Sequence, residues 1–184
     1  MIATKEESLL YHMSAEDYHK AHGASASRLG HLARSPAHLR HALANPVIPT
    51  RPMIMGSAVH SAILEPLLFE KEWAVLPEGD GRSKEVKEAR AELLESFKAD
   101  KILKAVEHRA VLEMRESVLN HPAASDLLDV SRSEVSAFWH DPTFDVACKA
   151  RIDALPEINS QFGRAIVDIK TTQDARERAF SRDL

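Results

Sequence analysis

The chain has 184 residues, 44% of them hydrophobic, and a formal net charge of −4 at pH 7. This length and apolar content predict one globular domain over residues 1–184 with a real core. Its apolar runs are all shorter than the about 20 residues that cross a bilayer, and its acidic N-terminus lacks the features of a signal peptide, so we expect a cytoplasmic protein without a membrane partner. Cys148 is the single cysteine, which excludes an intramolecular disulfide and a cysteine-based zinc or iron–sulfur site within this chain.

Charge is distributed very unevenly along the chain. Between Asp17 and Glu65 there is no acidic residue, and five Lys or Arg give this segment a charge of +5, which leaves −9 for the rest. Six of the ten histidines also lie there. Because salt screens charges beyond roughly 8–10 Å, a local basic stretch can bind phosphates although the whole protein is acidic. A solvated basic surface is the alternative interpretation.

Short helices are predicted near the N-terminus. The stretch SAED, which begins at Ser14, has the spacing of a capping box and opens a first helix. Ser25 or Ser27 caps a second helix, which ends at Ser35, where Pro36 starts a third. The following proline-rich stretch NPVIPTRP predicts a connector with little regular structure.

The next part of the chain is predicted to be mostly helical as well. Residues 53–64, MIMGSAVHSAIL, fit a helix buried on nearly all sides, in which Gly56 precedes His60 by one turn and leaves space beside it. EWAVLP predicts a short strand. The charged, periodic stretch 83–120 predicts amphipathic helices with solvated charges, and HPAASDLL predicts one more short helix.

From residue 131 onward the hydrophobic pattern has a period of two. SEVSAFWH predicts a strand, DPTFD a proline turn, and VACKARIDAL a second strand. The second strand is expected to have a core face and a polar face, formed respectively by Val146, Cys148, Ala150 and Ile152 and by Ala147, Lys149, Arg151 and Asp153. RAIVDIKTT predicts a third strand, which completes a three-stranded meander in an α+β fold.

Two acids and a lysine on these strands suggest phosphodiester chemistry. Asp153 and Asp168 come from adjacent predicted strands, and a carboxylate pair is costly unless a cation lies between its members. Mg²⁺ accepts one or two carboxylates together with water and substrate phosphate. Lys170 lies on the same predicted face as Asp168, in reach of an attacking water or a phosphate. The alternative is that Asp168 and Lys170 form a surface ion pair, and that His60 is a packed, hydrogen-bonded histidine.

Several stretches, taken in order, resemble a known nuclease family. They are MSAEDYHKAHGASASRLGHLARSPAHLRH, MIMGSAVHSAILEP, SEVSAFW, CKARIDAL and IVDIKTTQDARERAFSRDL. This set is similar to the nuclease domain of the exodeoxyribonuclease VIII (RecE-like) proteins of phages and prophages, which belong to the PD-(D/E)xK nuclease superfamily. The combination of GSAVHSAILEP with VDIKTT carries more of the resemblance than either motif alone.

The resemblance implies a fold, an activity and partners. The fold is restriction-endonuclease-like, with a mainly helical, DNA-binding part over residues 1–130 and catalytic strands over residues 131–184. The implied activity is that of a Mg²⁺-dependent 5′-to-3′ exonuclease on linear double-stranded DNA ends, for which Mn²⁺ can substitute. Such an enzyme would feed a single-strand annealing (RecT-like) protein in recombination within a bacterial or phage-infected cell. Related exonucleases form homo-oligomeric rings around DNA.

The resemblance also implies roles for individual residues. Asp153 matches the acid of the second core strand, Asp168 and Lys170 match the D-x-K motif, and His60 matches the helix histidine beside the metal. Mg²⁺ would then be held by the two aspartates and the backbone carbonyl of Ile169, with His60 supporting the site directly or through water. Lys170 would orient the attacking water or offset charge in the transition state.

Other residues are weaker candidates. Glu134 lies on a strand that can bring it to the same cleft, but a salt bridge to Arg151 or Lys149 explains it as well. The DNA backbone or its 5′ end is a candidate ligand of three residues in the acid-free segment, namely Ser27, Arg28 and Arg34.

The sequence also departs from the family pattern. The family continues past its D-x-K strand into a helix bearing Gln and Tyr and a further core strand, whereas this sequence stops at Leu184. The expectation that follows is a fold without its last core helix and strand. The alternative function is therefore a truncated, catalytically inactive DNA-binding or interaction remnant. An iron–sulfur nuclease is disfavoured because Cys148 is alone.

Overall fold

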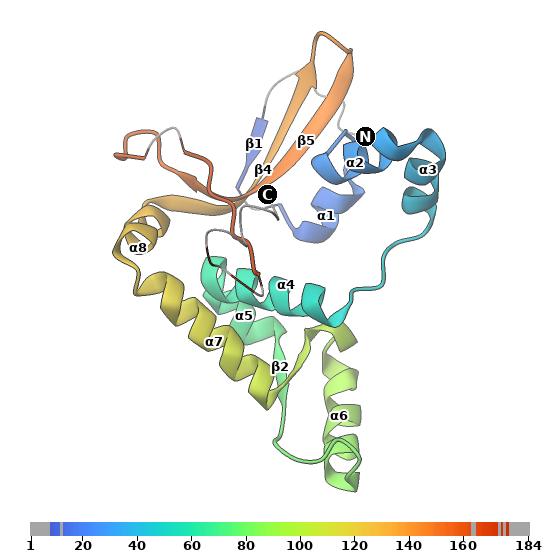
Figure 1. The fold of residues 1–184 in the computed structure, drawn as a ribbon, viewed down its shortest axis with the longest axis vertical. Coiled ribbons are helices and arrows are strands. Elements are labelled where there is room, and N and C mark those ends of the chain that lie inside the picture. The colour runs from blue at the N-terminus through green and yellow to red at the C-terminus, as the bar shows by residue number, and fades with distance from the viewer. Residues whose placement is uncertain (1–7, 12, 163–164, 173, 175, 177–184) are drawn as a thin grey trace. The chain divides into compact units, whose positions relative to one another are not determined.

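The computed structural model describes residues 8–11, 13–162, 165–172, 174 and 176. Within them the chain forms eight α-helices and two small β-sheets, so the predicted α+β class is confirmed (Figure 1). The chain divides into two compact units. We call residues 1–49 and 123–167 the hairpin unit, and residues 50–122 and 168–184 the helical unit. That both belong to one domain stays a prediction.

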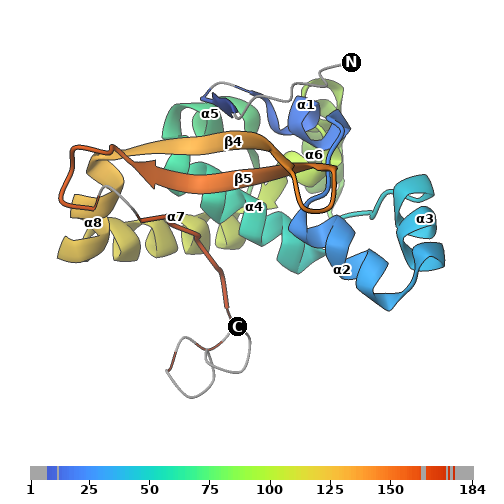
Figure 2. The same cartoon turned by 90° about the horizontal axis from the view of Figure 1, so that it is seen from above.

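A long β-hairpin forms the centre of the hairpin unit. β4 (Ser131–Asp141) and β5 (Val146–Pro156) pair antiparallel, and Figure 2 shows them side by side with their connecting turn at one end. The first two predicted strands and the turn between them are therefore confirmed. β1 (Ser8–Leu10), for which the sequence pattern predicted no strand, pairs antiparallel with the other edge of β4. The sheet order is β1-β4-β5.

The predicted third strand of the meander is reduced to a single bridge. Among residues 165–172, only Val167 pairs with β5: its N–H donates to the carbonyl oxygen of Ala154 at 3.0 Å, and the reverse bond measures 3.2 Å. The same edge of β5 also carries a parallel bridge from Ala24 to Cys148. The edge is thus divided between two segments. Residue 164, where the predicted strand begins, lies outside the described residues.

Three short helices precede the hairpin in the sequence, as predicted. They are α1 (Ala15–Lys20), α2 (Ala26–Arg34) and α3 (Pro36–Ala44). Ser14 and Ser35 cap α1 and α3, because each side-chain oxygen accepts a hydrogen bond from the backbone N–H three residues later. The predicted helix before β4 is α8 (Pro122–Asp129).

The two faces of β5 differ in burial from what the terms core face and polar face suggest. Lys149 is only 3% exposed, whereas Val146, on the expected core face, is 39% exposed. α1 covers the polar face: Tyr18 is buried there and its ring lies 6.3 Å from that of Phe138 on β4. The expected core face is therefore wrong at Val146, and the expected polar face is covered by a helix.

α4 (Arg51–Leu64) is the central helix of the helical unit, and α5 (Pro66–Glu72) follows it directly. α4 begins two residues before the predicted start, since a proline is well tolerated in the first turn of a helix. Burial is confined to its C-terminal half, while Met53 is 49% exposed, so the prediction of a helix buried on nearly all sides is wrong at its start. The buried residues are Ala58, Val59, Ala62, Ile63 and Leu64.

A two-stranded parallel sheet interrupts the helices of this unit. β2 (Ala74–Leu76), which was predicted, pairs with β3 (Ile102–Lys104), which lies inside the stretch predicted as helical. Ile102 and Leu103 are 2% and 0% exposed, and a strand buried on both faces shows no alternation that would distinguish it from a helix. This buried pairing is why the helix prediction fails at β3.

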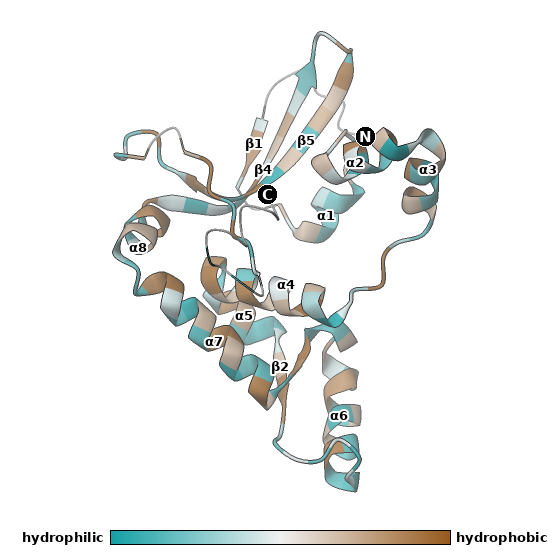
Figure 3. Cartoon of the chain, in the orientation of Figure 1, coloured by the Kyte–Doolittle hydropathy of each residue, from teal (hydrophilic) through white to brown (hydrophobic). Residues whose placement is uncertain are grey.

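The amphipathic helices on either side of β3 are confirmed. α6 (Lys84–Ser96) is capped by Ser83, and α7 (Ala105–Leu119) follows β3 directly. In Figure 3, α7 carries alternating hydrophobic and hydrophilic patches along its length. Within the described residues, no helix combines the length and apolar character that spanning a bilayer requires.

Candidate metal centre

Two carboxylates face each other across the central hairpin. The ladder pairs Ser133 with Ala154 and Val135 with Ile152, which places Glu134 opposite Asp153. One carboxylate oxygen of Glu134 lies within 4.8 Å of one carboxylate oxygen of Asp153. The backbone of Glu134 has φ 54°, a left-handed conformation that is uncommon for a residue other than glycine. The strand is thus locally distorted at one member of the carboxylate pair.

Arg151 binds Glu134 on the same face of the hairpin. Its Nε donates to Oε2 of Glu134, so of the two partners that the sequence allowed for this glutamate, the structure selects Arg151. Nη1 of Arg151 donates to the Ser136 hydroxyl at 3.0 Å and to the Met13 carbonyl at 2.9 Å. The side chains of Arg151 and Glu134 are 16% and 18% exposed. Arg151 therefore joins both strands to the segment before α1.

Lys149 anchors the C-terminal end of α1. Its Nζ donates to the carbonyl oxygens of Tyr18 at 2.6 Å and of Ala21 at 2.8 Å. Burial, followed by the positive charge of Arg28, lowers the pKa of Lys149 to about 8. Burial is also the main cause that raises the pKa of Tyr18. Lysine is favourable at a helix C-terminus because it compensates the partial negative charge there, so this contact is structural.

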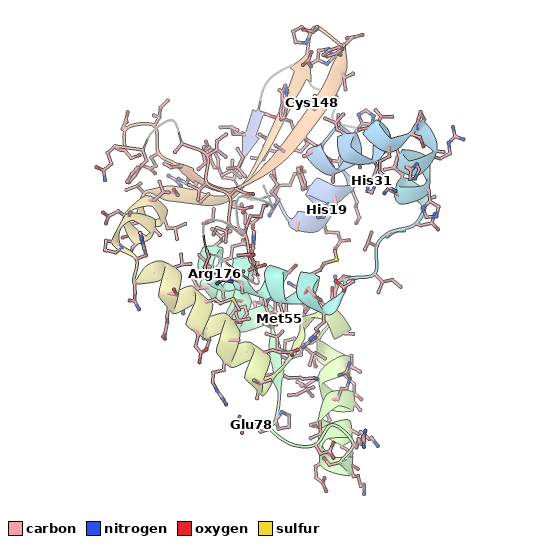
Figure 4. All side chains as sticks on the ribbon, viewed as in Figure 1. His19, His31, Met55, Glu78, Cys148 and Arg176 are labelled. Carbon is pink, nitrogen blue, oxygen red and sulfur yellow. The ribbon has the colours of Figure 1, made fainter. Side chains whose placement is uncertain are left out.

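His19 lies on α1 beside these cations, where Figure 4 labels it. Burial, and then the positive charges of Lys149, Arg151 and Arg28, lower the pKa of His19 below its ordinary value. The imidazole is therefore harder to protonate than one without cations beside it. This group of cations, of which Lys149 is buried, was missed at the sequence level, although Lys149 and Arg151 alternate on one strand face.

The three candidate DNA contacts have different surroundings. Nη1 of Arg28 donates to the Gly23 carbonyl at 2.7 Å, so its guanidinium is engaged by the protein's own backbone. The hydroxyl of Ser27 lies 3.3 Å from that of Ser25. Arg34, at the C-terminal end of α2, is exposed and forms no ion pair with the described residues. Of the three, Arg34 is the side chain most available to a ligand.

Asp168 and Lys170 contact each other. Lys170 Nζ donates to Asp168 Oδ1 at 2.8 Å, and the side chains are 59% and 58% exposed. Both are exposed while Val167 and Ile169 are half-buried, so the predicted alternation of faces is confirmed. The ion pair that was the alternative interpretation of this motif is present, as a surface interaction of small energetic weight.

His60 lies half-buried on α4, in the helical unit. One turn earlier, a Cβ atom at Gly56 would lie 3.3 Å from Oγ1 of Thr171, so the segment that follows Lys170 approaches this helix closely. The predicted open space beside Gly56 is thus occupied by Thr171. Within the helical unit, the D-x-K segment and the helix of His60 are neighbours. Within the hairpin unit, Asp153 lies with Glu134.

A comparison with curated proteins found no match. A protein-family model, described as a PDDEXK-like domain of unknown function (DUF3799), matches residues 25–184. The matched range includes His60, Glu134, Asp153, Asp168 and Lys170. It also includes both strands of the central hairpin and the D-x-K segment. The chain therefore belongs to this family of PDDEXK-like domains.

Proposed function

We propose that the protein is a metal-dependent 5′-to-3′ exodeoxyribonuclease that degrades linear double-stranded DNA in phage-type homologous recombination. Membership of a PDDEXK-like family supports a nuclease. The observation that carries the proposal is the bridge between Ala154 and Val167. In an antiparallel ladder, the residues that flank such a pair are also opposite each other, and here these are Asp153 and Asp168. This register supports the proposal of a shared metal site.

The metal is proposed to be Mg²⁺, with Mn²⁺ as a substitute. Its ligands would be Asp153, Asp168, His60 and the backbone carbonyl of Ile169, a donor set of mostly hard oxygens that fits such a cation. When bound, the metal polarises the scissile phosphate and lowers the pKa of a bound water. Lys170 pairs with Asp168 over 2.8 Å, and a ligand role for Asp168 would free the ammonium to orient water or offset phosphate charge.

DNA is proposed to contact the acid-free segment. Arg34 is exposed on α2, and Ser27 lies at the start of the same helix, whereas Arg28 is bound to the Gly23 carbonyl. We assign Arg34 the main phosphate contact, with Ser27 beside it and Arg28 holding the backbone in place. A single-strand annealing (RecT-like) protein and a homo-oligomeric ring around DNA are the further partners of this proposal.

Cleavage of end-labelled duplexes tests the proposal. Linear DNA labelled at either the 5′ or the 3′ end, and closed circular DNA, would be incubated with the purified protein and Mg²⁺. We expect early release of the 5′ label, persistence of the circle, and loss of activity in Asp168→Ala. Asp145→Asn, which removes an exposed carboxylate in the hairpin turn, is the matched control and should remain active. Activity that survives Asp168→Ala contradicts the proposed site.

A second candidate function is a DNA-binding protein without nuclease activity. The exposed pair of Asp168 and Lys170 favours it, because these side chains satisfy each other as an ordinary surface ion pair does. This candidate predicts DNA binding that weakens steeply with salt and depends on Arg34, with no product in the cleavage assay. Any Asp168-dependent cleavage excludes it.

A further inference from the structure

Arg151 binds Glu134, a carboxylate that lies opposite Asp153 of the candidate metal centre. We propose that Arg151 withholds Glu134 from the metal, so that Asp153 is the hairpin carboxylate that binds the cation and the centre selects Mg²⁺ over Ca²⁺. This inference rests on the proposed metal-dependent function. It gives Arg151 a specificity-determining role that the D-x-K motif does not contain.

The guanidinium is fixed by its contacts. Its Nε binds Glu134 on β4, while its Nη1 donates to the buried Ser136 hydroxyl at 3.0 Å and to the Met13 carbonyl at 2.9 Å. Ser136 is 0% exposed and Arg151 is 16% exposed. These acceptors belong to β4 and to the segment before α1. Another rotamer of Arg151 would lose the hydrogen bonds to both segments. The ion pair is therefore a fixed structural element of the hairpin.

Glu134 is held close to Asp153 and yet is neutralised. The two residues are opposite in the register, and their carboxylates offer oxygens within 4.8 Å of each other. Two such carboxylates would repel without a cation between them. Arg151 provides the cation on the Glu134 side, and the side chain of Glu134 is only 18% exposed. Separating a mostly buried ion pair to release one partner is strongly unfavourable.

The number of carboxylates decides which cation a site prefers. Ca²⁺ takes six to eight oxygen ligands in flexible geometry, whereas Mg²⁺ keeps several waters and is usually held by one or two carboxylates. A centre with Asp153 and Asp168 suits Mg²⁺. A third carboxylate from Glu134 would add charge and oxygen ligands and shift the preference toward Ca²⁺. Arg151 prevents this addition.

Calorimetric titration of the purified full chain with Mg²⁺ and with Ca²⁺, each alone, tests the inference. We expect Arg151→Gln to raise the affinity for Ca²⁺ relative to Mg²⁺ by about tenfold, because it frees Glu134. Glu134→Gln should leave the ratio of the two affinities unchanged, since Glu134 is not a ligand. A purely structural role of Arg151 would instead leave the ratio of the two affinities unchanged in both variants. A shift of the ratio in Arg151→Gln but not in Glu134→Gln therefore distinguishes selectivity from support.

Matched variants control for charge and folding. Arg132→Gln removes a positive charge from the exposed pair with Glu157 on the same hairpin, and should leave the ratio unchanged. If Arg151→Gln does not fold, Glu134→Gln still tests whether Glu134 is a ligand. A selective loss of Ca²⁺ affinity in Glu134→Gln, or an unchanged ratio in a folded Arg151→Gln, overturns the inference while the metal centre stands. A wild-type protein that binds neither ion overturns the proposed function as well.

Discussion

Lys149 Nζ lies 4.5 Å from the centre of the Tyr18 ring and donates a hydrogen bond to the carbonyl oxygen of the same residue at 2.6 Å. A single ammonium thus contacts both the aromatic face and the backbone of α1. Because Lys149 lies on the strand that carries Asp153, this contact ties the first helix to the strand of the candidate metal centre.

Lys149 makes stability depend on pH in the alkaline range. Its pKa is about 8 in the folded protein and near 10.5 without burial, so between these values the unfolded chain keeps a proton that the folded chain has lost. The free energy of unfolding should therefore rise as pH increases across this window. Urea unfolding at several pH values measures the rise. Lys149→Met should abolish it, whereas Lys20→Met, at an exposed position, should retain it.

The pair of Arg51 and Glu107 should make the helical unit sensitive to acid. The hydrogen bond from Arg51, which measures 2.6 Å from Nε to Oε1, is the first cause that lowers the pKa of Glu107. The stabilisation is present above the unfolded pKa and disappears as pH falls through the lower folded pKa. Glu107→Gln should cost about 1–2 kcal/mol at neutral pH and little in acid.

Denaturant unfolding at neutral and acidic pH measures this difference. Glu113→Gln on the same helix is the control, because Glu113 is exposed and has no ion-pair partner among the described residues. An equal effect of the two substitutions at neutral pH would show that the Arg51 pair contributes nothing.

The N-caps of α2 and α3 offer a matched comparison. The side chain of Ser35 accepts a hydrogen bond from the backbone N–H of His38 at 3.2 Å, whereas Ser25 makes no such bond at the start of α2. Ser35→Ala should lower the free energy of unfolding by about 1 kcal/mol, and Ser25→Ala by much less. Thermal unfolding of both variants measures the difference, and an equal loss would contradict the assigned cap.

Gly56 and Gly30 differ in what an added methyl group would meet. At Gly56 in α4 the new Cβ would lie 3.3 Å from Thr171 Oγ1, while at Gly30 in α2 it would meet nothing within 4 Å. Gly30→Ala should therefore gain the full helix propensity, about 1 kcal/mol, and Gly56→Ala should gain less because Thr171 must move. Equal gains in thermal unfolding would argue against the approach of residue 171 to α4.

Much of the local structure was predictable because its causes are local. Ser14 and Ser35 begin helices through bonds that reach three residues along the chain. The central hairpin follows from alternation on two strands joined by a proline turn. β1 was not predicted and β3 was predicted to be helical, because these three-residue strands depend on partners more than 25 residues away, which a local pattern does not contain.

The sequence by itself identified the residues that we propose for the chemistry. The order of His60, Asp153, Asp168 and Lys170 indicated a PD-(D/E)xK protein, and family membership agrees with that superfamily. The alternation of side chains along a strand also placed Asp168 and Lys170 on one face, since that depends only on the local backbone.

Tertiary structure alone decided how those charges are satisfied. In the folded chain Glu134 pairs with Arg151 rather than with Lys149, and Lys149 is buried against α1. Both choices depend on which distant backbone atoms come within hydrogen-bonding reach, and these lie 130 positions or more away, at Met13 and Tyr18. Pairing of a buried charge is a property of the packed interior, where an unpaired ion is strongly disfavoured, and no local sequence pattern specifies it.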